Sequence, residues 1–104
     1  ADVILVSPVS CWEVATLLCS GRIALDRDVY VWVRDLFASD EVEPAPLTPQ
    51  VAVSAALLAT AGFHGDPADR MLYATALEQS VPLVTKDGSI RSYAKKAGDL
   101  RTIW

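Results

Sequence analysis

Long hydrophobic runs are missing from this 104-residue chain. None reaches the eighteen or so apolar residues that a helix needs to cross a bilayer. The first residues also lack the basic segment and apolar core of a secretory signal. We therefore expect a cytoplasmic protein with no membrane partner.

Cysteine and histidine, the usual ligands of structural zinc, are scarce: the chain has two cysteines and one histidine. Cys11 and Cys19 are expected on one helix, where their Cα atoms would lie roughly 12 Å apart, too far for a disulfide. Neither has a partner at zinc-ligand spacing. We expect two buried thiols and no structural zinc, with His64 fixing a tight turn by a hydrogen bond.

Positive charge is also in deficit, since nine Lys and Arg face thirteen Asp and Glu and the formal net charge is -4. This balance argues against a broad basic surface for nucleic acid. Five of the nine basic residues, however, fall within the last nineteen positions: Lys86, Arg91, Lys95, Lys96 and Arg101. They are either a solvated helix face or a local phosphate-binding lobe.

The chain has no initiator Met and begins Ala-Asp-Val directly before a strand pattern. Its length allows one domain at most, and 52% hydrophobic with 21% charged residues is a globular composition. We expect residues 1–104 to be a single domain that is incomplete at its N-terminus.

Strand and helix patterns alternate along the chain. Strands are expected at Val3–Val6, Val81–Thr85 and Leu100–Trp104, the first two buried on both faces, with Glu41–Pro46 a loop or edge strand. Helices are expected from Ser7 or Ser10 to Gly21, and at Asp26–Ala38, Thr48–Gly62, Asp66–Gln79 and Ser89–Ala97. Trp12, Trp32 and Tyr73 are expected in the core or at an interface. The pattern predicts an α/β fold with a parallel sheet flanked by helices.

Three acids follow or lead into the strands, and sites in parallel sheets form at the carboxyl ends of strands. Glu13 follows the first strand, Asp87 follows Thr85 at the end of another, and Asp69 opens a helix that returns to the sheet. Carboxylates brought together without basic partners persist when a hard cation supplies positive charge. Mg²⁺ or Mn²⁺ at this edge would support hydrolysis of a phosphodiester.

Each acid also has a purely structural interpretation. Glu13 fits the last position of a capping box that begins at Ser10. Asp69 suits the dipole at a helix start, where Asp66 is better explained as the N-cap. Asp87 with Gly88 is a common turn dipeptide. Local sequence leaves the choice open, and only the constellation favours the metal site.

Several segments, taken together in order and spacing, resemble the PIN-domain ribonucleases, and within them the VapC-type toxins of toxin–antitoxin pairs. These segments are Val6–Ala15, Gly21–Leu25, Leu47–Thr48, His64–Arg70, Ala74–Leu77, Pro82–Asp87 and Thr102–Trp104. The resemblance implies a PIN fold, four acids that bind Mg²⁺ or Mn²⁺, cleavage of RNA, neutralisation by a cognate antitoxin, and a homodimer. Glu13, Asp69 and Asp87 match three of the acids, and Thr85 matches a supporting hydroxyl residue.

The fourth acid of that family lies at the end of an opening strand that has no counterpart here. Asp2 precedes its strand, so it should lie at the opposite edge of the sheet. The resemblance therefore implies that the first, central strand is missing from this chain, and we expect the fragment to be impaired as a nuclease.

Three functional interpretations follow. The first is a Mg²⁺- or Mn²⁺-dependent endoribonuclease toxin, and the second is a catalytically inactive PIN-fold module that binds an antitoxin or dimerises. The third, a phosphoacceptor receiver-like domain, is disfavoured because Thr85 and Lys86 lie at one strand end instead of on separate strands.

Overall fold

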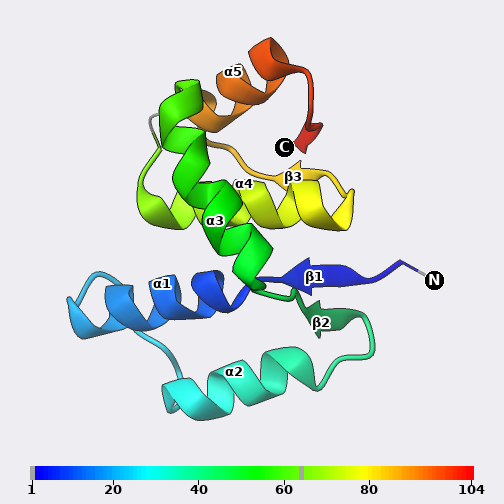
Figure 1. Ribbon diagram of the computed structural model, residues 1–104. Helices are drawn as coiled ribbons and strands as arrows, with labels where there is room; N and C mark the ends of the chain where they lie inside the picture. The colour runs from blue at the N-terminus through cyan, green and yellow to red at the C-terminus, as the bar shows by residue number, and fades with distance from the viewer. Residues whose placement is uncertain (1, 64) are drawn as a thin grey trace. The chain divides into compact units, whose positions relative to one another are not determined.

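The structure is a computed structural model that describes residues 2–63 and 65–104. It divides into two compact units, here called the N-terminal unit (Ala1–Pro46) and the C-terminal unit (Leu47–Trp104) (Figure 1). The expected turn-fixing role of His64 lies outside the described residues. Across the described ranges no helix is both long and apolar enough to cross a membrane.

The N-terminal unit contains a two-stranded parallel sheet and two helices. Its elements are β1 (Ile4–Val6), α1 (Pro8–Cys19), α2 (Val29–Phe37) and β2 (Val42–Pro44). β1 pairs with β2 from Ile4 opposite Val42 to Val6 opposite Pro44. The stretch left open as a loop or an edge strand is therefore an edge strand.

Ser7 and Ser10 were both possible N-caps of α1, and the structure uses Ser7. The Ser7 hydroxyl accepts a hydrogen bond from the Val9 amide at 3.0 Å, and Pro8 occupies the first helical turn. Proline suits that position because its missing N–H would have no helical partner there. Ser10, the other of the two competing caps, lies inside the helix.

The second helix starts later than predicted. Asp28, not Asp26, is the N-cap of α2, and its carboxylate accepts from the Tyr30 amide at 2.9 Å. Asp26 instead forms a two-bond ion pair with Arg27, which also reaches Asp35 at 2.7 Å. The neighbouring guanidinium thus takes the carboxylate that the helix start would have used.

The C-terminal unit also has a two-stranded parallel sheet. Its elements are α3 (Pro49–Leu58), the 3-10 turn η1 (Ala59–Ala61), α4 (Pro67–Gln79), β3 (Leu83–Val84), α5 (Gly88–Ala97) and β4 (Thr102–Ile103). β3 pairs with β4, placing Leu83 opposite Thr102 and Val84 opposite Ile103. Helices alternating with parallel strands in both units confirm the predicted α/β class.

Two helix starts in this unit agree with the sequence. Thr48 accepts from the Val51 amide at 3.1 Å, and Asp66 accepts from the Asp69 amide at 2.8 Å. A proline follows each cap, at the position where its fixed φ suits the helix. The sequence therefore positions the starts of α3 and α4 to the residue, whereas α3 ends at Leu58 and a 3-10 turn continues from Ala59 to Ala61, before the expected end at Gly62.

The core of the C-terminal unit is built around three aromatic rings, those of Phe63, Tyr73 and Tyr93. Their centroids lie 4.9 to 5.4 Å apart in tilted or edge-on contacts. Tyr73 is completely buried, and its hydroxyl donates to Asp99 at 2.6 Å. Burial first, and then this bond, raise the pKa of Tyr73, so the hydroxyl stays protonated and keeps donating. The prediction that Tyr73 is a core aromatic is confirmed.

Several other burial predictions are wrong. Ile4 is 62% exposed and Val84 is 67% exposed, although both strands were expected to be buried on both faces. Within residues 2–63 and 65–104, each of these strands pairs with one other strand of its own unit. Of the two expected buried thiols, Cys19 is exposed and Cys11 is half-buried. Trp12 is exposed, so of its two expected places the core is wrong and the interface stays a prediction.

Replacing Tyr73 with Phe removes the hydroxyl that donates to Asp99 while keeping the buried ring. We expect the free energy of unfolding to fall by about 1 kcal/mol, the scale of one lost hydrogen bond. Urea unfolding at pH 7 measures the change. Tyr30→Phe is the matched control, since Tyr30 is 84% exposed, and should alter stability by less than about 0.5 kcal/mol. Equal losses in both variants would contradict the role given to the hydroxyl.

Candidate functional site

Asp69 lies in the first turn of α4 and is half-buried. Its backbone amide is held by the Asp66 cap, which fixes the side chain at the helix start. Burial is the main factor that raises the pKa of Asp69, followed by the negative charges of Asp66 and Asp87. A carboxylate in this setting gains from a nearby cation.

The loop before α4 has no room for a side chain at Gly65, the residue before Asp66. A Cβ atom at Gly65 would collide with the ring of Phe63 and lie 3.1 Å from the Asp69 Cβ. The Gly65 carbonyl also accepts from the Arg70 guanidinium at 3.2 Å. Only a residue without a side chain lets the loop pass this close to the core and to Asp69.

Asp87 joins the end of β3 to the start of α5. Its carboxylate is the N-cap of α5 and accepts from the Ile90 amide at 3.0 Å. Its own amide donates to the Thr85 hydroxyl at 3.1 Å, so Thr85 fixes the turn that carries Asp87. Asp87 was predicted to be a metal ligand, with a turn residue as the alternative; its role as the N-cap of α5 was not predicted. The spacing of Asp87 to the apolar Ile90, three residues on, was the signal for it.

Asp69 and Asp87 belong to the same electrostatic cluster, although eighteen residues separate them in the chain. The charge of Asp87 acts on Asp69 because α4 begins near the turn that leaves β3. The expectation that both lie at one edge of the sheet stays a prediction. Asp66 has the structural N-cap role predicted for it and adds a third negative charge.

Glu13 lies in the second turn of α1, in the N-terminal unit, and is half-buried. Its convergence with Asp69 and Asp87 stays a prediction. Within residues 2–63 and 65–104, no three or more Cys, His, Asp and Glu side chains are grouped so as to hold a metal ion. The chemistry of the donor set nevertheless suits a hard cation, because Asp69 and Asp87 offer carboxylate oxygens and the charge of Asp87 acts on Asp69.

Comparison with known proteins assigns the family. The sequence matches the PIN domain model over residues 1–96, and the chain therefore belongs to the PIN-domain family. It is 42% identical over 93 residues to Ribonuclease VapC22 of Mycobacterium tuberculosis (strain ATCC 25618 / H37Rv), a match that covers 89% of this chain and 69% of that protein. The predicted resemblance to PIN-domain proteins of the VapC type is confirmed.

The raised pKa of Asp69 sets a pH dependence. Asp69 stays protonated to higher pH in the folded than in the unfolded chain, so its charged form opposes folding. The stability that its neutral form permits is complete below the ordinary Asp pKa of about 4 and is lost as the pH rises through the folded value.

We expect carboxyl-resolved NMR titration in the absence of divalent cations to place the Asp69 pKa above its ordinary value. Asp66→Asn and Asp87→Asn should each lower it, with the larger change for Asp66, because each removes a repelling charge. Asn also preserves both N-caps. Glu78→Gln, an exposed change near the other end of α4, is the control and should leave the value unchanged. An Asp69 pKa that is the same in Asp87→Asn and in the wild type would contradict the electrostatic cluster.

Proposed function

We propose that this chain is part of a Mg²⁺- or Mn²⁺-dependent endoribonuclease toxin that hydrolyses RNA phosphodiester bonds. The observation that carries the proposal is the placement of two acids, Asp69 in the first turn of α4 and Asp87 between β3 and α5, with the charge of Asp87 acting on Asp69. The match to a protein named Ribonuclease VapC22 supports RNA as the substrate. We propose Glu13, Asp69 and Asp87 as the metal ligands.

Two carboxylates suit the binding of a divalent cation. Mg²⁺ keeps several of its waters and is bound by one or two carboxylates together with a substrate phosphate. Two acids in the C-terminal unit are therefore enough to begin such a site, and Glu13 would complete it. A cation bound by both acids would offset the repulsion from Asp87, one of the charges that raise the pKa of Asp69.

Asp87 and Thr85 have different roles in the proposed site. When bound, the ion would lower the pKa of a water and stabilise the charge that develops on the phosphoryl oxygens. Asp87 uses one carboxylate oxygen to cap α5 and keeps the other available as a ligand. Thr85 touches neither substrate nor ion in this scheme; it is a positioning residue that holds the Asp87 turn.

The chain also has features that support a second function, that of a protein-binding module. Trp12 and Tyr30 are exposed in the N-terminal unit, and Val53 and Leu57 are exposed one turn apart on α3. Exposed apolar side chains gathered at such positions are typical of interaction surfaces. We propose a cognate antitoxin and a second copy of the chain as partners. The impaired activity and cytoplasmic location expected from the sequence stay proposals as well.

Cleavage of a mixed single-stranded RNA by the chain tests the nuclease. We expect weak cleavage with Mg²⁺ or Mn²⁺, in keeping with the proposed impairment, and none in EDTA. Asp69→Asn and Asp87→Asn should each lose about 100-fold or more, because several kcal/mol of transition-state stabilisation go with a ligand. A gel-based rate assay measures this. Glu13→Gln should behave similarly if Glu13 completes the site.

Asp66→Asn is the matched control for these variants. It removes a neighbouring charge of the same cluster but keeps a capping side chain, so the rate should stay within about threefold. Full cleavage in EDTA would refute metal dependence. A chain that binds Mn²⁺ at Asp69 and Asp87 but cuts no RNA, and that associates with an antitoxin, would favour the binding module.

The positioning role of Thr85 has its own signature. Thr85→Val removes the acceptor of the Asp87 amide and should weaken Mn²⁺ binding about tenfold, the scale of an outer support to a metal ligand. Thr85→Ser keeps the hydroxyl and should restore the affinity. Titration followed by Mn²⁺ electron paramagnetic resonance measures both. Equal affinities in Val and Ser variants would show that the hydroxyl is dispensable.

A further inference from the structure

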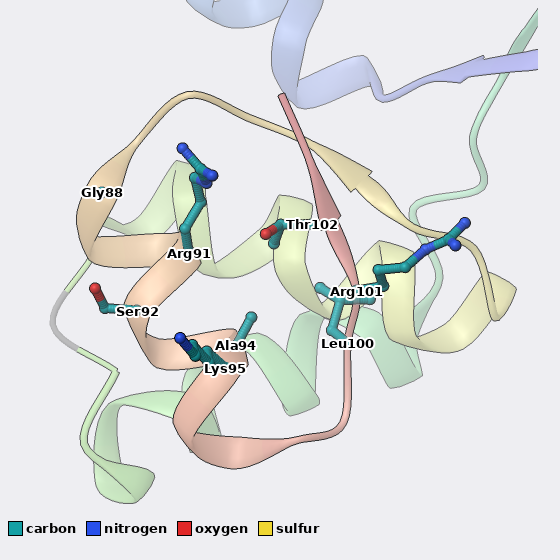
Figure 2. Close-up of a pocket in the computed structure, with 8 residues that line it drawn as sticks. All are labelled: Gly88, Arg91, Ser92, Ala94, Lys95, Leu100, Arg101 and Thr102. Atoms are coloured by element: carbon teal, nitrogen blue, oxygen red, sulfur yellow. The ribbon is translucent and has the colours of Figure 1, made fainter.

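A surface pocket lies between α5 and the strand that ends the C-terminal unit, with a volume of about 500 Å³. Figure 2 shows the residues that line it: Gly88, Arg91, Ser92, Ala94, Lys95, Leu100, Arg101 and Thr102. Ala94 and Leu100 give it an apolar part, and Ser92 and Thr102 add hydroxyl groups. None of these residues belongs to the proposed carboxylate site.

Three cations surround this pocket. Arg91 and Lys95 come from α5 and Arg101 comes from the segment that enters β4 (Figure 2). All three are exposed, and in the described parts of the chain none forms an ion pair within 4.0 Å. Their long side chains extend outward in different directions and do not converge on one point. An uncompensated, divergent set of cations suits a chain of phosphates better than a single small anion.

Helix α5 connects this pocket to Asp87 of the proposed metal site. Arg91 and Lys95 are four residues apart in α5, so they lie on one side of the helix, and Asp87 caps the start of that helix. From Asp87 to Lys95 the distance along the axis is roughly 12 Å. Gly88, the residue after Asp87, already lines the pocket. A strand held at Asp87 therefore has a cationic path along α5.

The charge distribution points the same way. Residues 86–101 carry five basic and two acidic side chains, whereas the rest of the chain carries four basic and eleven acidic. An extended polyanion would be repelled by most of the molecule and attracted here. Single-stranded nucleic acid binds in grooves of this kind, where basic side chains follow the backbone.

We propose that the pocket formed by Arg91, Lys95 and Arg101 binds the phosphodiester backbone of the RNA strand beside the scissile phosphate. The inference rests on the proposed function for the choice of RNA. The carboxylates then select the bond that is cut, while α5 supplies affinity that the acidic chain otherwise lacks. The hydroxyls of Ser92 and Thr102 lie among the cations and are available to donate to phosphate oxygens.

Binding is measured with the full chain, a fluorescein-labelled single-stranded RNA of mixed sequence and EDTA throughout, so that cleavage and divalent ions do not contribute. Fluorescence anisotropy at a series of salt concentrations gives the Kd and its salt dependence. The test variant is Arg91→Gln with Lys95→Gln and Arg101→Gln. Losing three phosphate contacts should reduce the slope of log K against log salt by about 2 and raise Kd at least tenfold at low salt.

Lys96→Gln is the matched control. Lys96 adjoins Lys95 on α5 but lines a different pocket, together with Phe63 and Tyr93. It should lower the slope by less than about 0.7, the value of a single contact. Thermal unfolding of all variants checks the fold, which should be unchanged because the substituted side chains are exposed.

The outcomes separate this inference from the proposed nuclease. A triple variant that binds RNA with the wild-type slope overturns the pocket, whatever the cleavage assay gives. Asp69→Asn should abolish cleavage yet keep RNA binding in EDTA; if it keeps cleavage while the triple variant loses binding, the nuclease proposal fails and the pocket stands. Displacement of RNA by an equally charged poly-glutamate at the same concentration would assign the pocket to an acidic protein segment and overturn the RNA inference.

Discussion

The hydrogen bond from the Ile90 amide to Asp87 is the interaction on which the C-terminal unit depends most. It sets the residue at which α5 begins, and a helix rotates by a fixed amount per residue. Ile90 and Ala94 therefore face the aromatic core, while Arg91 and Lys95 face solvent. The same bond holds Asp87 directly after β3, where its charge acts on Asp69. One cap thus links the core, the carboxylates and the basic pocket.

The folded chain holds Asp69 in surroundings that disfavour its charged form. Burial and two like charges raise the pKa of Asp69, which means that its ionised form is disfavoured in the folded chain. Nothing in the packing of α4 requires an acid there, since Asp66 already caps the helix. Residues that oppose folding yet persist are typical of functional sites. The aromatic core beneath, centred on Tyr73, supplies the rigidity that holds such a cluster in place.

Local chemistry explains how much of the fold could be predicted. The starts of α3 and α4 were correct because a capping side chain followed by proline acts within four residues and needs no tertiary contact. The start of α2 was wrong because Arg27 competes for Asp26, and side-chain competition is not visible in a helix pattern. The burial of β1 and β3 was overestimated because a hydrophobic run does not tell how many strands will cover it.

The sequence by itself determined the alternation of helices and parallel strands, the caps at Thr48 and Asp66, and the acids expected at strand ends. It also determined the family, since ordered motifs along most of the chain carry that resemblance. Only the tertiary structure decided that Asp69 and Asp87 share one electrostatic cluster and that the late basic residues surround a pocket. The physical reason is the separation along the chain over which each interaction acts. Caps and periodicity act over a few residues, whereas charge and pocket shape depend on segments that folding brings together from distant parts of the chain.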